Sequence, residues 1–307
     1  MPFAKANGIE IAYEETGDRT RPAILLIMGL GAQLTFWPEP LYHGLAREGF
    51  RVIRFDNRDM GLSTKFDDAP PVDILAAYAK LLRGEKIASP YALDDMARDA
   101  IGLLDDLAID QAHIVGASMG GMIAQLIAAD HGARVRSLIS IMSTSGEPHL
   151  PQGKPEALAV LSATPPPASD REANIVHGVK CQQAIGSASL PTPEADLRTK
   201  VARAFDRSND FGGVPRQLLA VIAAGSRAEA LGRIKAPTLV IHGTEDPLIP
   251  AEGGKDTAAR IKGAQLMLVA GMGHDFPAPL IANLVRAIAS HCRTADIAHA
   301  QMFALPK

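Results

Sequence analysis

The chain has 307 residues, of which 47% are hydrophobic and 21% are charged, so it can bury a large core in one large domain or two modest ones. Its formal net charge is −3, with acidic and basic residues interspersed, which excludes the charge pattern of a nucleic-acid or anionic-membrane binder. The expected partner is therefore a small molecule, and the sequence leaves monomer and homo-oligomer open.

Residues 1–8 lack an apolar signal-peptide core, and no apolar stretch approaches the ~20 residues that cross a bilayer. We therefore expect no membrane span and a cytoplasmic location. The two cysteines, Cys181 and Cys292, are far apart and lack C-x-x-C spacing. This indicates neither a disulfide framework nor a zinc site, so both are expected to be packing residues and no metal or cofactor is predicted.

Short apolar runs rich in Ile, Val and Leu alternate with helix-like segments along most of the chain. Their continuous apolar character predicts strands buried on both faces, as in a mostly parallel sheet with helices on either side. The predicted fold class is therefore α/β. The expected strands are residues 9–13, 23–28, 52–55, 113–115, 135–141, 238–241 and 266–269.

Residues 28–31, Met-Gly-Leu-Gly, follow the second expected strand, and their glycines let a backbone approach a substrate closely. The alternative is a tight turn without a further role. Phe36 and Trp37 come next. We expect them to line an apolar substrate pocket, with core packing as an equal possibility.

The third expected strand is followed by residues 56–63, Asp-Asn-Arg-Asp-Met-Gly-Leu-Ser, which gather charges beside a strand end. A substrate site is one interpretation of this run. We favour a structural role, because paired Asp and Arg side chains beneath a sheet edge can hold loops in register.

The fourth expected strand leads into residues 116–121, Gly-Ala-Ser-Met-Gly-Gly, and a helix is expected over 122–129. This is the sequence form of a nucleophile elbow, in which a strained turn exposes the hydroxyl of Ser118 and glycines two residues away on each side relieve crowding. A Gly-rich turn without a nucleophile is the alternative. For acyl transfer at Ser118, the backbone amides of Met119 and Leu30 are the expected oxyanion donors.

The strand pattern breaks over residues 146–232, where nine of the 22 prolines fall, so this segment is not expected to join the sheet. Helices are expected over 197–205 and 214–224. We interpret 146–232 as a helical cap over Ser118, with residues 1–145 and 233–307 as the core domain. Residues 294–307 are expected to form a loosely held tail.

A serine nucleophile needs a base that is itself oriented by a carboxylate. The turn after the strand at 238–241 holds two adjacent carboxylates, Glu245 and Asp246. We predict Asp246 as the acid, because Pro247 fixes the turn at that point. Glu245 is expected to be a solvated turn charge, and Glu147 is the other alternative.

His274 lies in residues 271–275, Gly-Met-Gly-His-Asp, directly after the last expected strand. Loops after parallel strands lie at the edge of an open α/β sheet where ligands bind, so His274 is the predicted base. His242 ends an apolar run and His113 begins one. Both are therefore expected to be core or rim residues.

The elbow, the Asp-Pro turn and the Gly-x-Gly-His turn follow one another in the order serine, acid, histidine, and with them the chain resembles the α/β-hydrolase superfamily over nearly its whole length. Residues 28–29, 57–63, 118–120 and 271–274 are similar to the aclacinomycin methylesterase branch, whose lidded enzymes cleave a carboxylic methyl ester. Met28 stands where many superfamily members carry histidine, and Asp59 where many carry glycine. Both departures favour this branch.

The resemblance implies an α/β-hydrolase fold with a helical lid insertion and a cofactor-independent serine hydrolase. It is expected to cleave a carboxylic ester through an acyl-enzyme, with Ser118, His274 and Asp246 as the triad. An iminopeptidase, a carbon-carbon bond hydrolase and a perhydrolase are alternatives on the same residues, and a slow-turnover ligand receptor is an alternative of another class. Epoxide and haloalkane hydrolases are disfavoured because those relatives carry aspartate in place of Ser118.

Overall fold

The computed structural model describes residues 1–161 and 163–304. Within them the strands are β1 (Phe3–Ala6), β2 (Ile9–Thr16), β3 (Ala23–Ile27), β4 (Arg51–Phe55), β5 (Ala112–Ala117), β6 (Val135–Ile141), β7 (Thr238–Gly243) and β8 (Gln265–Val269). The α-helices are α1 (Glu39–Arg47), α2 (Ile74–Leu82), α3 (Leu93–Asp106), α4 (Met119–Asp130), α5 (Pro155–Leu161), α6 (Arg171–Ile185), α7 (Glu194–Arg207), α8 (Val214–Ala224), α9 (Ala228–Arg233), α10 (Ala251–Arg260) and α11 (Ile281–Ala304). Short 3-10 helices are η1 (Leu34–Phe36), η2 (Gly132–Arg134) and η3 (Ala278–Leu280).

The strands form one sheet in the order β1-β2-β4-β3-β5-β6-β7-β8. From β4 to β8 the neighbours are parallel, and β2 joins β4 in an antiparallel pair. Every predicted strand is present, and β6 has the predicted bounds. The predicted α/β class, with a mostly parallel sheet, is therefore confirmed.

The two edges of the sheet differ from the prediction. β1 was not among the expected strands; it pairs antiparallel with β2 through a turn at Asn7 and Gly8, whose φ angles are +48° and +82°. An Asn-Gly pair with two positive φ angles is the sequence signal for such a hairpin. At the other edge, Leu266 and Leu268 of β8 are exposed, so this strand is not buried on both faces.

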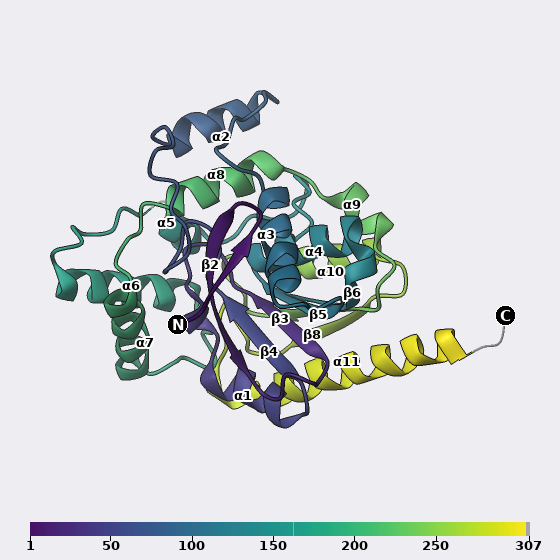
Figure 1. Ribbon diagram of the computed structural model, residues 1–307. Helices are drawn as coiled ribbons and strands as arrows, with labels where there is room; N and C mark the ends of the chain where they lie inside the picture. The colour runs from purple at the N-terminus through teal and green to yellow at the C-terminus, as the bar shows by residue number, and fades with distance from the viewer. Residues whose placement is uncertain (162, 305–307) are drawn as a thin grey trace.

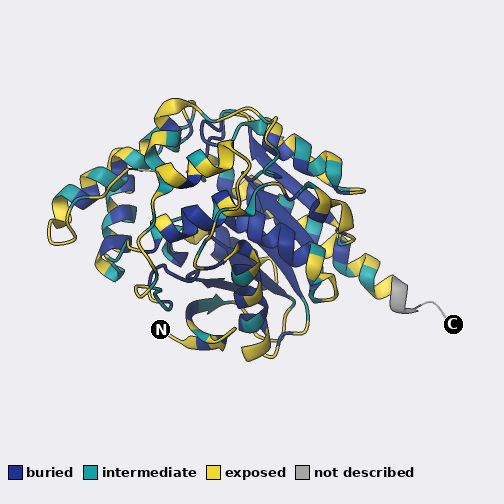
Figure 2. Ribbon diagram, turned by 90° about the horizontal axis from the view of Figure 1, so that it is seen from above, coloured by how far each residue is buried: buried dark blue, intermediate teal, exposed yellow. Residues whose placement is uncertain are grey.

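β3 explains why the central apolar runs are continuous. All five of its residues are buried, with Leu25 and Ile27 in the core on one face and Ile24 and Leu26 in the core on the other. Successive strand residues point to opposite faces, so burying all of them requires helices on both. The first core takes side chains from α3 and α4 and the second from α1 and α11, and Figure 2 shows the buried strands between helices with exposed outer sides.

Helices α5 to α9 all lie between β6 and β7 in the sequence, and none of the described residues of this segment joins the sheet. The helices expected over 197–205 and 214–224 are present as α7 and α8, the second with the predicted bounds. α6 packs on α7, and α8 packs on α2. Figure 1 shows α6 and α7 together at one side of the sheet and α8 with α2 above it.

The expected loose tail at 294–307 is wrong for its first residues, which are helical and packed. α11 continues through it to Ala304, and Ala295 is buried. Asp296 accepts a hydrogen bond of 2.8 Å from Arg136 on β6. These contacts anchor α11 to the sheet as far as Asp296, whereas most of residues 297–301 are exposed and residues 305–307 lie outside the described part.

Candidate active site

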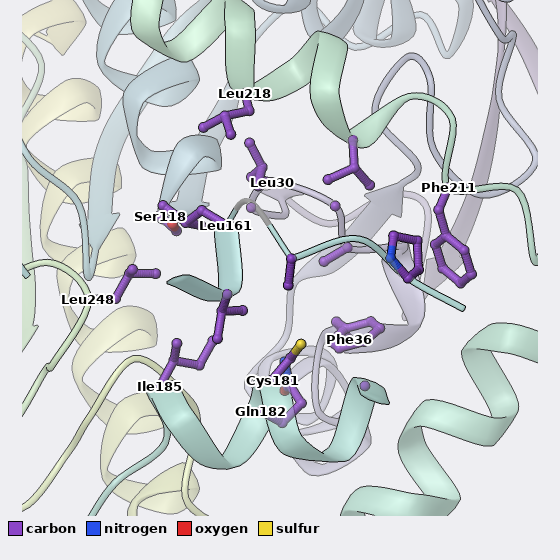
Figure 3. A pocket seen from close by; sticks show the side chains of 18 of the residues that line it. Leu30, Phe36, Ser118, Leu161, Cys181, Gln182, Ile185, Phe211, Leu218 and Leu248 are labelled. Atoms are coloured by element: carbon purple, nitrogen blue, oxygen red, sulfur yellow. The ribbon is translucent and has the colours of Figure 1, made fainter. Parts of the chain in front are cut away.

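Ser118 lies between β5 and α4, in the turn that the sequence predicts. Its φ and ψ angles are +56° and −122°, a strained conformation for a residue with a side chain. Its backbone N–H donates to Ile141 O at 2.9 Å, which ties the turn to the neighbouring strand β6. The serine is partly exposed and lines the cavity drawn in Figure 3.

The glycines on either side of Ser118 have a steric cause. A Cβ atom at Gly116 would lie 2.0 Å from Gly120 O, and one at Gly120 would lie 2.0 Å from Ile27 O. Both distances are far inside van der Waals contact. The expectation that glycines at these two positions relieve crowding around the turn is therefore confirmed.

His274 and Asp246 come from the loops after β8 and β7 and meet at the end of the sheet. His274 Nδ1 lies 2.8 Å from Asp246 Oδ2, and both side chains are buried. The backbone N–H of His274 donates to Ile185 O of α6 at 2.9 Å. The bond to Asp246 fixes the ring and leaves Nε2 as the nitrogen that can accept a proton.

Asp246 is held as a carboxylate. Its Oδ1 accepts hydrogen bonds from the backbone N–H groups of Leu248 at 2.9 Å and Ile249 at 2.8 Å. Burial opposes ionisation, but the neighbouring His274 and the hydrogen bonds that the carboxylate accepts outweigh it and hold the pKa of Asp246 well below its usual range. A permanent negative charge therefore faces the imidazole.

The other candidate acids lie elsewhere. Glu245 is partly exposed and accepts hydrogen bonds from the amide and hydroxyl of Ser189. Glu147 accepts hydrogen bonds from Ser226 and Arg260. Of the three carboxylates considered, Asp246 is the one that the structure brings to His274.

The other candidate histidines are structural, as expected. His113 is fully buried and hydrogen bonds to Ser137 Oγ at 2.8 Å. His242 is fully buried, and its Nε2 donates to Ile249 O at 2.8 Å while lying 3.5 Å from Asp246 Oδ2. It packs behind Asp246, on the turn that carries the acid.

Residues 28–31 lie against the serine. A Cβ atom at Gly29 would stand 3.0 Å from Ser118 Cβ, so no larger residue fits here without a shift. The loop is held by side chains, because Asn57 Nδ2 donates to Met28 O at 2.8 Å and the N–H of Gly31 donates to Gln217 Oε1 at 2.9 Å. Leu30 lines the cavity beside Ser118, whereas Met119 is buried directly after it.

The charged run 56–63 has the structural role that we favoured. Arg58 donates two hydrogen bonds of 2.6 Å to Asp99 on α3. Asp59 accepts two of 2.8 Å from Arg216 on α8, and these bonds help hold the pKa of Asp59 low against the opposing effect of burial. Both pairs are buried and bidentate, so the run ties α3 and α8 to the end of β4.

Ser118 and His274 line one cavity of about 970 Å³, a volume suited to a small organic ligand. Most of the lining is apolar and comes from α5, α6, α7 and α8 as well as loops at the carboxyl ends of the strands; it includes Leu161, Ile185, Val201, Phe205, Phe211, Leu218 and Leu248. Phe36 lines this cavity (Figure 3), as expected.

Trp37 does not line the cavity, so the pocket role is wrong for this residue and core packing, the equal possibility, is what the structure shows. The side chain is 1% exposed and packs in the core on the Phe276 ring, with centroids 5.4 Å apart. The chain leaves η1 in an extended conformation at Trp37.

Several polar residues of the cavity wall were not predicted from the sequence as site residues, among them Cys181 and Gln182 on α6 and Lys200 on α7. These three belong to no motif and converge only when the two helices pack. Cys292 is a buried core residue, as expected, whereas Cys181 lines the cavity and burial raises the pKa of its thiol. The described residues include no group of three or more His, Cys, Asp and Glu side chains that could hold a metal ion.

Residues 22–277 match the family described as the alpha/beta hydrolase fold. This match covers most of the chain, so the chain belongs to the α/β-hydrolase family and is a hydrolase. The described part of the chain contains no helix with the length and apolar character needed to cross a membrane.

Two similar proteins are methylesterases. Rhodomycin D methylesterase DauP of a Streptomyces species is 28% identical, over 92% of this chain and 95% of its own length. Rhodomycin D methylesterase DnrP of Streptomyces peucetius is 27% identical, over 97% of this chain and 100% of its own. Among solved structures, the enol-lactonase from Burkholderia xenovorans is 26% identical, with a TM-score of 0.68 over 96% of this chain and 98% of its own. The expected resemblance to methylesterases is confirmed.

Proposed function

We propose that this protein is a serine hydrolase that cleaves a carboxylic ester through an acyl-enzyme. The observation that carries the proposal is the Asp246–His274 hydrogen bond of 2.8 Å at the wall of the cavity onto which the strained Ser118 opens. A serine needs a base and an orienting acid, and these residues supply both. The names of the two methylesterase relatives support ester hydrolysis in particular.

In the proposed reaction, His274 Nε2 accepts the hydroxyl proton as Ser118 Oγ attacks the ester carbonyl carbon. The tetrahedral intermediate collapses, the carbon-oxygen bond to the alcohol breaks, and the imidazolium returns the proton to the departing alcohol. The same histidine then accepts a proton from water, which attacks the acyl carbon; the bond to Ser118 Oγ breaks, the imidazolium returns the proton to Oγ, and the carboxylic acid leaves. Asp246 stays ionised throughout and stabilises the imidazolium.

The backbone amides of Leu30 and Met119 are the proposed oxyanion donors. The close approach of Gly29 to Ser118 puts the first loop beside the reacting centre, and the bonds from Asn57 and Gln217 hold that loop in one conformation. Fixed donors need no rearrangement as negative charge develops, and removing one donor typically costs on the order of 100-fold in rate.

Residues 146–232 are the proposed cap. Helices α6, α7 and α8 of this segment supply much of the apolar cavity wall, and His274 is tied to α6 through its backbone. Such a wall suits an ester with a sizeable apolar acid part. The methylesterase relatives favour a small alcohol as the leaving group.

Steady-state hydrolysis of p-nitrophenyl acetate, butyrate and octanoate by the wild type and Ser118→Ala tests the proposal. We expect robust multiple turnover that falls by on the order of 10³-fold or more in the variant. Ser169→Ala, in the exposed loop before α6, is the matched control and should keep wild-type rates. Covalent labelling of Ser118 by an alkyl phosphonate, located by mass spectrometry, provides an independent readout.

Equal activity in the wild type and Ser118→Ala would remove Ser118 as the nucleophile. If neither protein turns over any ester and the phosphonate leaves Ser118 unmodified, ester hydrolysis is wrong. Saturable ligand binding without turnover would then favour the receptor alternative.

A further inference from the structure

Lys200 on α7 is the one lysine or arginine among the described residues that line the cavity. Its Nζ donates a hydrogen bond to Gln182 Oε1 at 3.3 Å and lies 4.6 Å from the centroid of the Phe36 ring. Both of these neutral groups also line the cavity. A cationic group is therefore fixed in the wall of a largely apolar site.

No carboxylate balances this charge directly. Within the described part of the chain Lys200 makes no ion pair, whereas the buried Arg58 and Arg216 each have a bidentate carboxylate partner. Burial lowers the pKa of Lys200 to about 8, although Asp275 opposes the shift. An ammonium group in such surroundings gains stability when an anion approaches it.

The nearest candidate for that role within the chain is already engaged. Asp275 accepts a hydrogen bond from Ser187 Oγ, and burial raises the pKa of its carboxyl group. Asp73, the other carboxylate of the lining, accepts from Ala76 N at the start of α2. Neither forms an ion pair with Lys200.

The geometry leaves room for a ligand at Lys200. An ammonium group has three N–H donors, of which Gln182 accepts one and the Phe36 ring contacts the cation through its face. In Figure 3 Phe36 and Gln182 lie on a different side of the cavity from Ser118. The same bound molecule can therefore contact both places through different groups.

We propose that Lys200 binds a carboxylate on the acid part of the substrate while the ester group lies at Ser118. This inference rests on the proposed ester hydrolysis and narrows the substrate class to esters that carry a second, free carboxylate separated from the ester by an apolar segment. A single ammonium group matches a monoanion. A phosphate dianion would bring more charge into the apolar wall than Lys200 neutralises.

Matched esters test this proposal. The monomethyl esters of linear dicarboxylic acids with six to twelve carbons are compared with the methyl esters of monocarboxylic acids of the same length. At the best chain length we expect wild-type kcat/KM to be at least about tenfold higher for the acid-bearing ester, mainly through a lower KM, as one charged contact can supply.

Lys200→Met removes the charge at similar volume. It should abolish the preference for the acid-bearing ester and leave kcat/KM for the neutral ester within about threefold of wild type. Lys180→Met is the matched control, because Lys180 is exposed on the neighbouring helix α6 and is not among the lining residues. Lys200→Arg keeps a charge and should keep part of the preference.

Two kinetic results overturn the inference: no wild-type preference at any chain length, or an equal loss for both esters in a folded Lys200→Met variant. Failure of the proposed function is distinct, because then neither ester turns over in the wild type. In that case calorimetric binding of the monomethyl esters decides the matter. Binding lost in Lys200→Met supports the anion site, and unchanged binding rules it out.

Discussion

The turns at the carboxyl ends of the strands and the helical wall of the cavity differ in how far their arrangement can be recognised from neighbouring residues in the sequence. At the sheet edge Ser118, Asp246 and His274 each lie in a short strand-to-turn motif, and each turn can be recognised from a few neighbouring residues. In the wall, Gln182 and Lys200 come from two helices and meet only through helix packing. The chemistry is thus specified locally, whereas substrate choice depends on contacts between distant segments.

The largest loss of activity is expected for Asp246→Asn, in the turn after β7. The NH2 group of an asparagine can donate to Nδ1 of His274, which favours the tautomer with its proton on Nε2, where no hydroxyl proton can then be accepted. We therefore expect kcat to fall by on the order of 10⁴, which corresponds to a barrier higher by about 5 kcal/mol. Single-turnover kinetics with p-nitrophenyl butyrate measures this loss. Glu245→Gln, one residue away and bonded to Ser189, is the matched control and should stay within about twofold.

Trp37 lies in the core and Phe36 in the cavity wall, so substitutions at these adjacent positions compare the two environments. Trp37→Ala removes a fully buried ring and should lower the free energy of unfolding by about 3–5 kcal/mol. Phe36→Ala should cost only about 1–2 kcal/mol but raise KM for p-nitrophenyl octanoate. Urea unfolding and steady-state kinetics on both variants separate these effects. Similar losses of stability would contradict the different positions of the two rings.

Glycine variants test how tightly the backbone is packed around the turn at Ser118. Gly120→Ala pushes a Cβ into the Ile27 carbonyl and should lower the free energy of unfolding by about 1–3 kcal/mol. Gly232→Ala, on helix α9 with no atom within 4 Å of the added Cβ, should instead stabilise the protein by up to about 1 kcal/mol. Chemical denaturation distinguishes the two, and a harmless Gly120→Ala would show that the elbow is less crowded than these distances require.

The smallest effect concerns stability at Lys200. Its pKa is lowered from 10.5 to about 8 in the folded state, so between these pH values the unfolded chain binds more protons and stability rises with pH. The cost to folding of burying the protonated Lys200 side chain is fully present below about pH 8. Lys200→Met should therefore raise Tm at pH 7 by about 2–4 °C, with the gain shrinking toward pH 10. A gain that is independent of pH would mean that packing, not charge, is responsible.

The sequence predicted the α/β class, the strained turn at Ser118 and the pairing of Asp246 with His274, because strand ends and glycine-rich turns leave short-range patterns. The sequence-based prediction failed where a residue's environment depends on a contact with a residue far away in the sequence. Trp37 and Phe36 are chemically similar neighbours, and tertiary contacts such as that of Trp37 with Phe276 place one of them in the core. α11 is still packed at Ala295, where the next residue, Asp296, accepts a hydrogen bond from Arg136, which lies 160 positions earlier. The Asn7 turn was a local signal that could have been recognised.

Helix α8 belongs to the proposed cap by its place in the sequence, but its hydrogen bonds hold it to the core. Arg216 pairs with Asp59, and Gln217 bridges the N–H of Gly31 and the carbonyl of Arg58. A chimaera that exchanges the whole of 146–232 for the cap of a relative therefore severs the support of the loop beside Ser118. A graft that ends before α8 keeps those bonds, so the useful junction for redesigning selectivity lies inside the insertion, not at its boundary.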